Sequence, residues 1–73
     1  MREKLIIALA EALEIDSDRI EEADLFREYD AYSSLTELSV LAMLDSEFGI
    51  EIEMNEFNKY KTVGDLIRLI SKE

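Results

Sequence analysis

The sequence predicts an all-α domain of four helices, in which a long loop separates the first two helices and the third helix is short. Three segments repeat apolar residues at three- and four-residue spacing, which is typical of helices with one buried face. Serine, threonine and glycine stand where these helices are expected to begin or end. Because the chain has only 73 residues, 48% of them hydrophobic, we expect residues 1–73 to form a single domain with one small core.

The first helix is predicted over about residues 3–14, with its apolar positions on one face. A polar loop of about twenty residues follows, and a loop of this length in a small domain indicates either a functional role or a cost in stability. Four apolar side chains are spaced to pin the loop to the core: Ile15, Ile20, Leu25 and Phe26. Residues 16–18, "DSD", favour a turn or a helix cap.

The second helix is predicted over residues 35–48, and Gly49 is expected to end it. Its predicted apolar stripe is Leu38, Leu41, Ala42, Leu44 and Phe48, with Val40 and Met43 at the flanks. The following "IEIEM" alternates like a strand but has no partner strand, so we expect an extended link with Ile50 and Ile52 in the core.

A short helix is predicted around residues 55–60, and a final helix begins at Thr62. The hydroxyl of Thr62 and the carboxylate of Asp65 have the spacing of a capping box. The expected buried face of the final helix is Val63, Leu66, Ile67 and Ile70. Lys72 would lie near its C-terminus, where a cation is favourable.

The residue types present exclude several kinds of chemistry. The chain has no cysteine and no histidine, so it lacks disulfides, thiolate nucleophiles, zinc sites built on these residues and a Ser–His relay. The acid-rich segments lack a glycine at the place where a calcium loop needs one. We therefore expect neither a metal site nor an enzyme. No apolar run of membrane-spanning length and no signal-peptide pattern is present, which predicts a cytoplasmic protein.

The net charge of −10 is concentrated in the first part of the chain. Residues 1–58 hold sixteen acids against four bases, whereas residues 59–73 carry a small positive excess. An acidic surface repels the phosphates of nucleic acids and attracts basic patches on proteins. We expect protein partners and no nucleic acid.

Two adjacent serines at the start of the second helix admit two interpretations. Ser34 and Glu37 have the spacing of a capping box, and Ser33 competes as the cap. On local physics a structural cap is favoured. A serine that follows a long loop and opens a helix also exposes its hydroxyl, and the helix N-terminus stabilises an attached phosphate. Both interpretations stay open from the residues alone.

The stretch "SSLTELSVLAMLDSEFGIEIE" and the closing "TVGDLIRLI" resemble the acyl carrier protein family over nearly the whole chain. The resemblance implies a four-helix bundle that carries 4′-phosphopantetheine, donated by coenzyme A, on Ser34. Ser33 is the less favoured attachment residue because no leucine follows it. Ser33 also stands where the family usually has aspartate, and Asp30 is a nearby acid that would partly replace it.

The resemblance further implies a non-catalytic carrier that holds acyl groups as thioesters for fatty-acid, polyketide or related biosynthesis. Its implied partners are a phosphopantetheinyl transferase and acyl-loading and acyl-processing enzymes with basic patches. The implied docking residues are Leu35, Glu37, Leu38, Ala42, Asp45 and Glu47. An apolar face of Leu38, Leu41, Ile52 and Tyr60 is expected to shelter a short acyl chain.

Two alternatives remain: a carrier of aminoacyl or hydroxyacyl groups, and an acidic helical adaptor that is never modified. The start at Met1 and the fit of both terminal helices predict a free-standing monomeric carrier.

Overall fold

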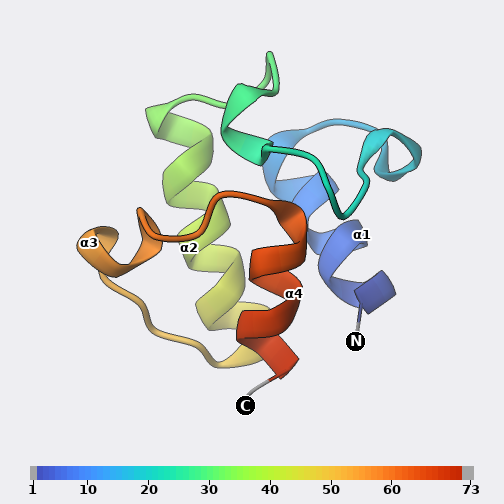
Figure 1. The fold of residues 1–73 in the computed structure, drawn as a ribbon. Coiled ribbons are helices and arrows are strands. Elements are labelled where there is room, and N and C mark those ends of the chain that lie inside the picture. Colours follow the sequence, from blue (N-terminus) through green and yellow to red (C-terminus); the bar gives the residue numbers. More distant parts are fainter. Residues whose placement is uncertain (1, 72–73) are drawn as a thin grey trace.

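The computed structural model describes residues 2–71, and the fold in this range is all-α (Figure 1). Its α-helices are α1 (Arg2–Leu13), α2 (Ser34–Phe48), α3 (Met54–Phe57) and α4 (Val63–Ser71). The connection between α1 and α2 contains two 3-10 turns, η1 (Ser17–Arg19) and η2 (Phe26–Glu28). The predicted order of helices is confirmed, with a long connection after α1 and a short α3.

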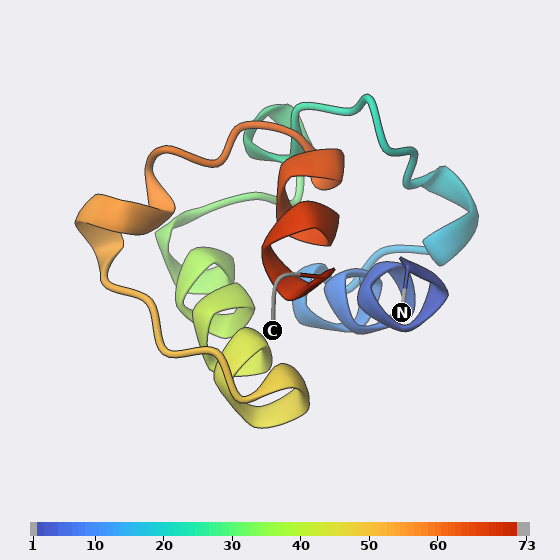
Figure 2. The same ribbon diagram turned by 60° about the horizontal axis from the view of Figure 1, so that its bottom comes forward.

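The helices enclose one core. In both views α4 lies between α1 and α2, while α3 lies beside α2 on the side away from α1 (Figures 1 and 2). The largest side chains that are fully buried come from all four helices and from η2: Leu5, Leu9, Leu13, Phe26, Val40, Leu44, Phe57, Val63, Leu66 and Ile70. Of the helices described in residues 2–71, none has the length and apolar character needed to cross a membrane.

The buried face of α2 differs from the predicted stripe. Val40, Met43 and Leu44 are buried, whereas Leu38 is 58% exposed and Ala42 is also exposed. The stripe was wrong at these two positions because α2 carries apolar residues on nearly every side, so their spacing does not select one face. The predicted end is confirmed, since Gly49 adopts a left-handed conformation with φ 67°.

The long connection is tied to the start of α4 through its backbone. The carbonyl of Asp24 accepts from the amide of Val63 at 3.0 Å, and that of Glu22 accepts from the amide of Gly64 at 2.8 Å. These bonds satisfy amides that have no acceptor inside α4. Among the predicted pins, Ile20 and Phe26 are buried and Ile15 is partly buried. The prediction was wrong for Leu25, which is 45% exposed; the backbone of this residue forms an antiparallel bridge with Thr62.

The capping box of α4 is confirmed. The hydroxyl of Thr62 accepts from the amide of Asp65 at 3.1 Å, and the Asp65 carboxylate accepts from the amide of Thr62 at 3.1 Å. On the predicted buried face, Val63, Leu66 and Ile70 are buried, and Ile67 is partly buried. The expectation for Lys72 lies outside the described residues.

The Asp65 carboxylate predicts an acid-sensitive contribution to stability. The backbone amides of Lys61 and Thr62 donate to this carboxylate and lower its pKa below the ordinary value of 3.8. A folded pKa below the unfolded one stabilises the fold above pH 3.8, and this contribution is lost as the pH falls through the folded value. Asp65→Asn should therefore lower the free energy of unfolding at neutral pH, and the difference from the wild type should shrink in acid.

Urea unfolding across this pH range measures the effect, with Glu56→Gln as the control. Glu56 is an exposed acid whose contact to Lys59 spans 3.7 Å, so this variant should stay near the wild type throughout. A loss in Asp65→Asn that is equal at neutral and acid pH would contradict the assignment.

Candidate functional site

The start of α2 is capped by Ser33. This residue is extended, with φ −153° and ψ 176°, and its side-chain oxygen accepts from the amide of Thr36 at 3.3 Å. In return, the Thr36 hydroxyl oxygen accepts from the amide of Ser33 at 2.7 Å. The two residues form a reciprocal capping box.

The predicted capping box between Ser34 and Glu37 is therefore wrong. The box is shifted by one residue: Thr36 takes the part predicted for Glu37, and the Glu37 carboxylate instead accepts from the Tyr32 hydroxyl at 2.5 Å. The amide of Glu37 instead donates to the main-chain carbonyl of Ser33 at 2.8 Å. Of the two serines, Ser33 is the one used to cap the helix.

Ser34 is the first residue of α2 and is exposed. In the part of the chain that the structure describes, its hydroxyl makes no hydrogen bond. The amides of Ser34 and Leu35 open the helix and have no acceptor within it. A negatively charged group on the Ser34 oxygen would sit at the positive end of the helix dipole.

Beside this helix start, the Arg27 guanidinium is enclosed between two aromatic rings. Its carbon lies 4.9 Å from the ring centres of Phe26 and Phe57. It donates to the carbonyl of Phe57 at 2.8 Å and to the carbonyl of Tyr60. Arg27 thus joins η2 to the end of α3.

Glu37 completes this group of side chains. One of its carboxylate oxygens lies 3.9 Å from Nε of Arg27, and its side chain is 18% exposed. Burial, followed by the hydrogen bond to Glu37, raises the pKa of Tyr32 above its ordinary value. We call Arg27, Tyr32, Glu37, Phe26 and Phe57 the Arg27 cluster.

Arg27 was not predicted to be part of a site and counted only among the four bases of residues 1–58. An arginine inside an acidic loop gives no periodic signal. The one clue is that it follows Phe26, which was predicted to be buried.

The predicted docking residues fall into two groups. Leu35 is 76% exposed, and Leu38, Ala42, Asp45 and Glu47 are also exposed. Glu37 differs, because its carboxylate is already engaged by Tyr32 and Arg27. The docking role of all six residues stays a prediction.

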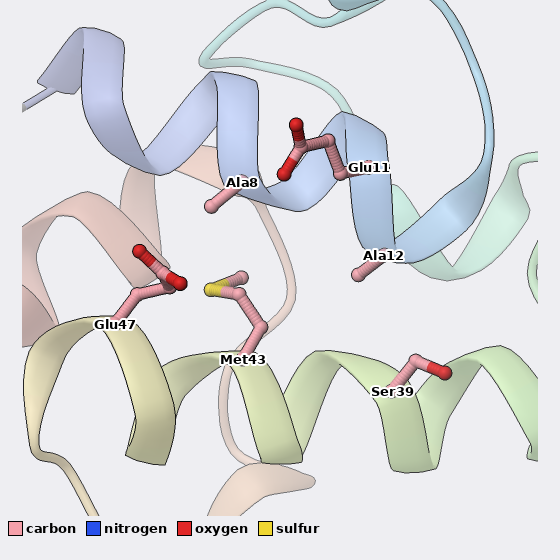
Figure 3. Close-up of a pocket in the computed structure, with 6 residues that line it drawn as sticks. All are labelled: Ala8, Glu11, Ala12, Ser39, Met43 and Glu47. Carbon is pink, nitrogen blue, oxygen red and sulfur yellow. The ribbon is translucent and has the colours of Figure 1, made fainter.

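The residues predicted to shelter an acyl chain also fall into two groups, which differ in burial. Leu41, Ile52 and Tyr60 are partly buried and pack against the core, whereas Leu38 faces solvent. A separate hollow lies between α1 and α2 and is lined by Ala8, Glu11, Ala12, Ser39, Met43 and Glu47 (Figure 3). Its lining includes two carboxylates, which makes it a poor apolar site.

Within residues 2–71, the fold and the site define a class: a small helical domain whose second α-helix begins with an exposed serine hydroxyl that makes no hydrogen bond. The comparisons agree with this class. Residues 3–70 match the family described as "Phosphopantetheine attachment site". The chain is also 31% identical over 71 residues to an acyl carrier protein of Thermosynechococcus vestitus, covering 97% of this chain and 88% of the relative.

The chain therefore belongs to the acyl carrier family of phosphopantetheine attachment domains. The cofactor of this family is 4′-phosphopantetheine. The helix start fits such a group, because an exposed hydroxyl that makes no hydrogen bond to any described residue stands next to backbone amides with no acceptor inside the helix.

The capping geometry predicts that the two serines differ in their effect on stability. Ser33→Ala should lower the free energy of unfolding by about 1 kcal/mol, because the cap to Thr36 is lost. Ser34→Ala should change it by less than about 0.5 kcal/mol, since its exposed hydroxyl has no partner. Urea unfolding of both variants beside the wild type tests this. An equal loss in Ser34→Ala would mean that Ser34 caps the helix.

Proposed function

We propose that the chain is an acyl carrier whose Ser34 holds the phosphopantetheine arm and whose cargo is carried as a thioester. The observation that carries the proposal is the difference between the two serines: Ser33 is used as the cap, and Ser34 is exposed, with a hydroxyl that makes no hydrogen bond within residues 2–71. Membership of the family supports the arm itself.

Attachment would proceed with the Ser34 hydroxyl as acceptor. A bond forms between its oxygen and the phosphorus of coenzyme A that bears pantetheine. The bond from that phosphorus to the bridging oxygen of the pyrophosphate breaks, and adenosine 3′,5′-bisphosphate leaves. The hydroxyl proton passes to a base on the transferase, because no side chain of residues 2–71 accepts a hydrogen bond from the Ser34 hydroxyl.

The chain then acts as a support for the arm. Once attached, the arm supplies the thiol that the sequence lacks, and the thiol carries the acyl group. The free amides at the start of α2 stabilise the negative charge on the Ser34 oxygen substituent. No group on the chain is assigned to acyl chemistry, so the proposal is a non-catalytic carrier in fatty-acid, polyketide or related biosynthesis.

One observation favours a second candidate, an unmodified adaptor. Ser33 is neutral, and its side chain is occupied by the capping box. A transferase that requires an acid directly before the attachment serine would not act on this chain.

Modification is tested by intact mass and peptide mapping after incubation with coenzyme A and a transferase of broad specificity. The wild type should gain one phosphopantetheine on the peptide that contains Ser34. Ser34→Ala should gain none, and the matched control Ser33→Ala should still be modified. If the wild type remains unmodified but Ser33→Asp is loaded, the neutral residue sets transferase specificity. If neither is loaded, the adaptor is favoured.

Transferase docking should depend more on apolar contact than on charge. Leu35 and Leu38 are the exposed apolar residues next to Ser34, whereas the free acids of α2 lie near its far end. Leu38→Ala should raise the KM of the transferase for this carrier about tenfold, since burying a leucine contributes about 1.5–3 kcal/mol. Asp45→Asn should change it less than about threefold.

The control for this prediction is Ile7→Ala, which removes an equally exposed apolar residue on α1. It should leave KM unchanged. A steep rise of KM with added salt, together with a large effect of Asp45→Asn, would instead show electrostatic docking.

A further inference from the structure

We propose that this carrier displays short or polar acyl groups at its surface, because the Arg27 cluster closes the region between α2 and α3 to an alkyl chain. The inference rests on the proposed function and names its class of cargo. It concerns the interior nearest to Ser34, where an acyl chain on an arm would enter.

The first step is the position of Arg27. It belongs to η2, which lies next to the start of α2, and its bonds reach the end of α3 (Figure 1). The guanidinium donates to the carbonyls of Phe57 and Tyr60 and lies 3.9 Å from Glu37. A charged side chain, 26% exposed, therefore links the three elements that border this region.

The apolar interior under the start of α2 is occupied by aromatic side chains. Phe26 and Phe57 are fully buried, and their ring centres are 5.8 Å apart. Tyr32 packs edge-on against Phe26, with ring centres 5.7 Å apart. Aromatic rings at these separations are in direct contact, so the apolar volume under the start of α2 is filled by the chain's own side chains.

Entry of an alkyl chain between α2 and α3 would disrupt the contacts of the Arg27 cluster. An alkyl chain would have to part Phe57 from Phe26 and lift the guanidinium off two carbonyls. The Tyr60 carbonyl would lose the guanidinium next to an apolar chain, which offers no hydrogen bonds. The Phe57 carbonyl would keep only the amide of Tyr60, and Glu37 would keep only the hydroxyl of Tyr32. A short chain has little apolar surface to offset this loss, and a polar acyl group has still less.

The experiment places a labelled octanoyl group on the arm and asks what it touches. Because the chain has no cysteine, Ser34→Cys can be alkylated at one site with a pantetheine-like arm that ends in ¹³C-octanoyl. Isotope-filtered NOEs and the unfolding temperature are compared with those of the acetyl form. We expect no NOEs from the octanoyl chain to Phe26, Phe57 or Leu44, and a shift in Tm of less than about 1 °C.

Two variants on the same background test the cause. Arg27→Leu removes the charge, and Phe57→Ala opens space; each should gain NOEs from octanoyl to Leu44 and a rise in Tm on acylation. Arg19→Leu is the matched control, because Arg19 is an exposed arginine in η1, and it should behave like Ser34→Cys alone. Circular dichroism confirms that each variant is folded.

Two kinds of result would contradict the proposal. NOEs from octanoyl to Phe26 or Phe57 without the added substitutions would overturn the proposal, as would NOEs to Met43 in the hollow between α1 and α2. Folded variants that gain no NOEs would overturn the role of Arg27 and Phe57. The alkylation needs no transferase, so failure of coenzyme A to load Ser34 counts against the proposed function only.

Discussion

The capping box between Ser33 and Thr36 sets the chemistry of the whole helix start. The rotation of α2 about its axis is fixed by the burial of Val40 and Leu44. The place where the helix begins is fixed by the cap. With Ser33 as N-cap, Ser34 becomes the first helical residue, and its hydroxyl makes no hydrogen bond to the part of the chain that the structure describes. If the cap were shifted by one residue, the Ser34 hydroxyl would accept the capping hydrogen bond and would not be free.

The same arrangement redirects the charges around Ser34. Since Thr36 supplies the second half of the box, Glu37 is free to pair with Tyr32 and Arg27. The two residues that adjoin Ser34 in the sequence, Ser33 and Leu35, are uncharged, although the chain as a whole carries a charge of −10. Under the proposed function, the wider acidic surface would favour encounter with a basic partner. Leu35 and Leu38 are the exposed apolar side chains available for contact near the helix start.

The sequence predicted the helices where a local signal and the tertiary packing agree. In α4 the capping residues and the apolar spacing select the same start and the same face, and both were confirmed. In α2 two overlapping cap patterns compete, and the choice depends on Tyr32 and Arg27, which lie outside the helix. The exposure of Leu38 was missed for a related reason: a helix that is apolar on most sides shows its buried face only when its neighbours are in place.

The proposed class of cargo depends on a comparison of two free energies: that of burying an acyl chain and that of the contacts made by Arg27. A four-carbon acyl chain gains at most about 2–3 kcal/mol on leaving water, at about 0.8 kcal/mol for each methylene. Two hydrogen bonds from a guanidinium contribute about 3–6 kcal/mol together, and contact with two aromatic rings adds to this. For a short acyl chain, the free energy gained on leaving water is therefore smaller than the free energy lost when the contacts of Arg27 are broken, and the interior stays closed. A longer chain gains more but must also displace Phe57, which is fully buried. If the Arg27 cluster closes the interior as proposed, the arginine that engages Glu37 also keeps a short acyl group at the surface.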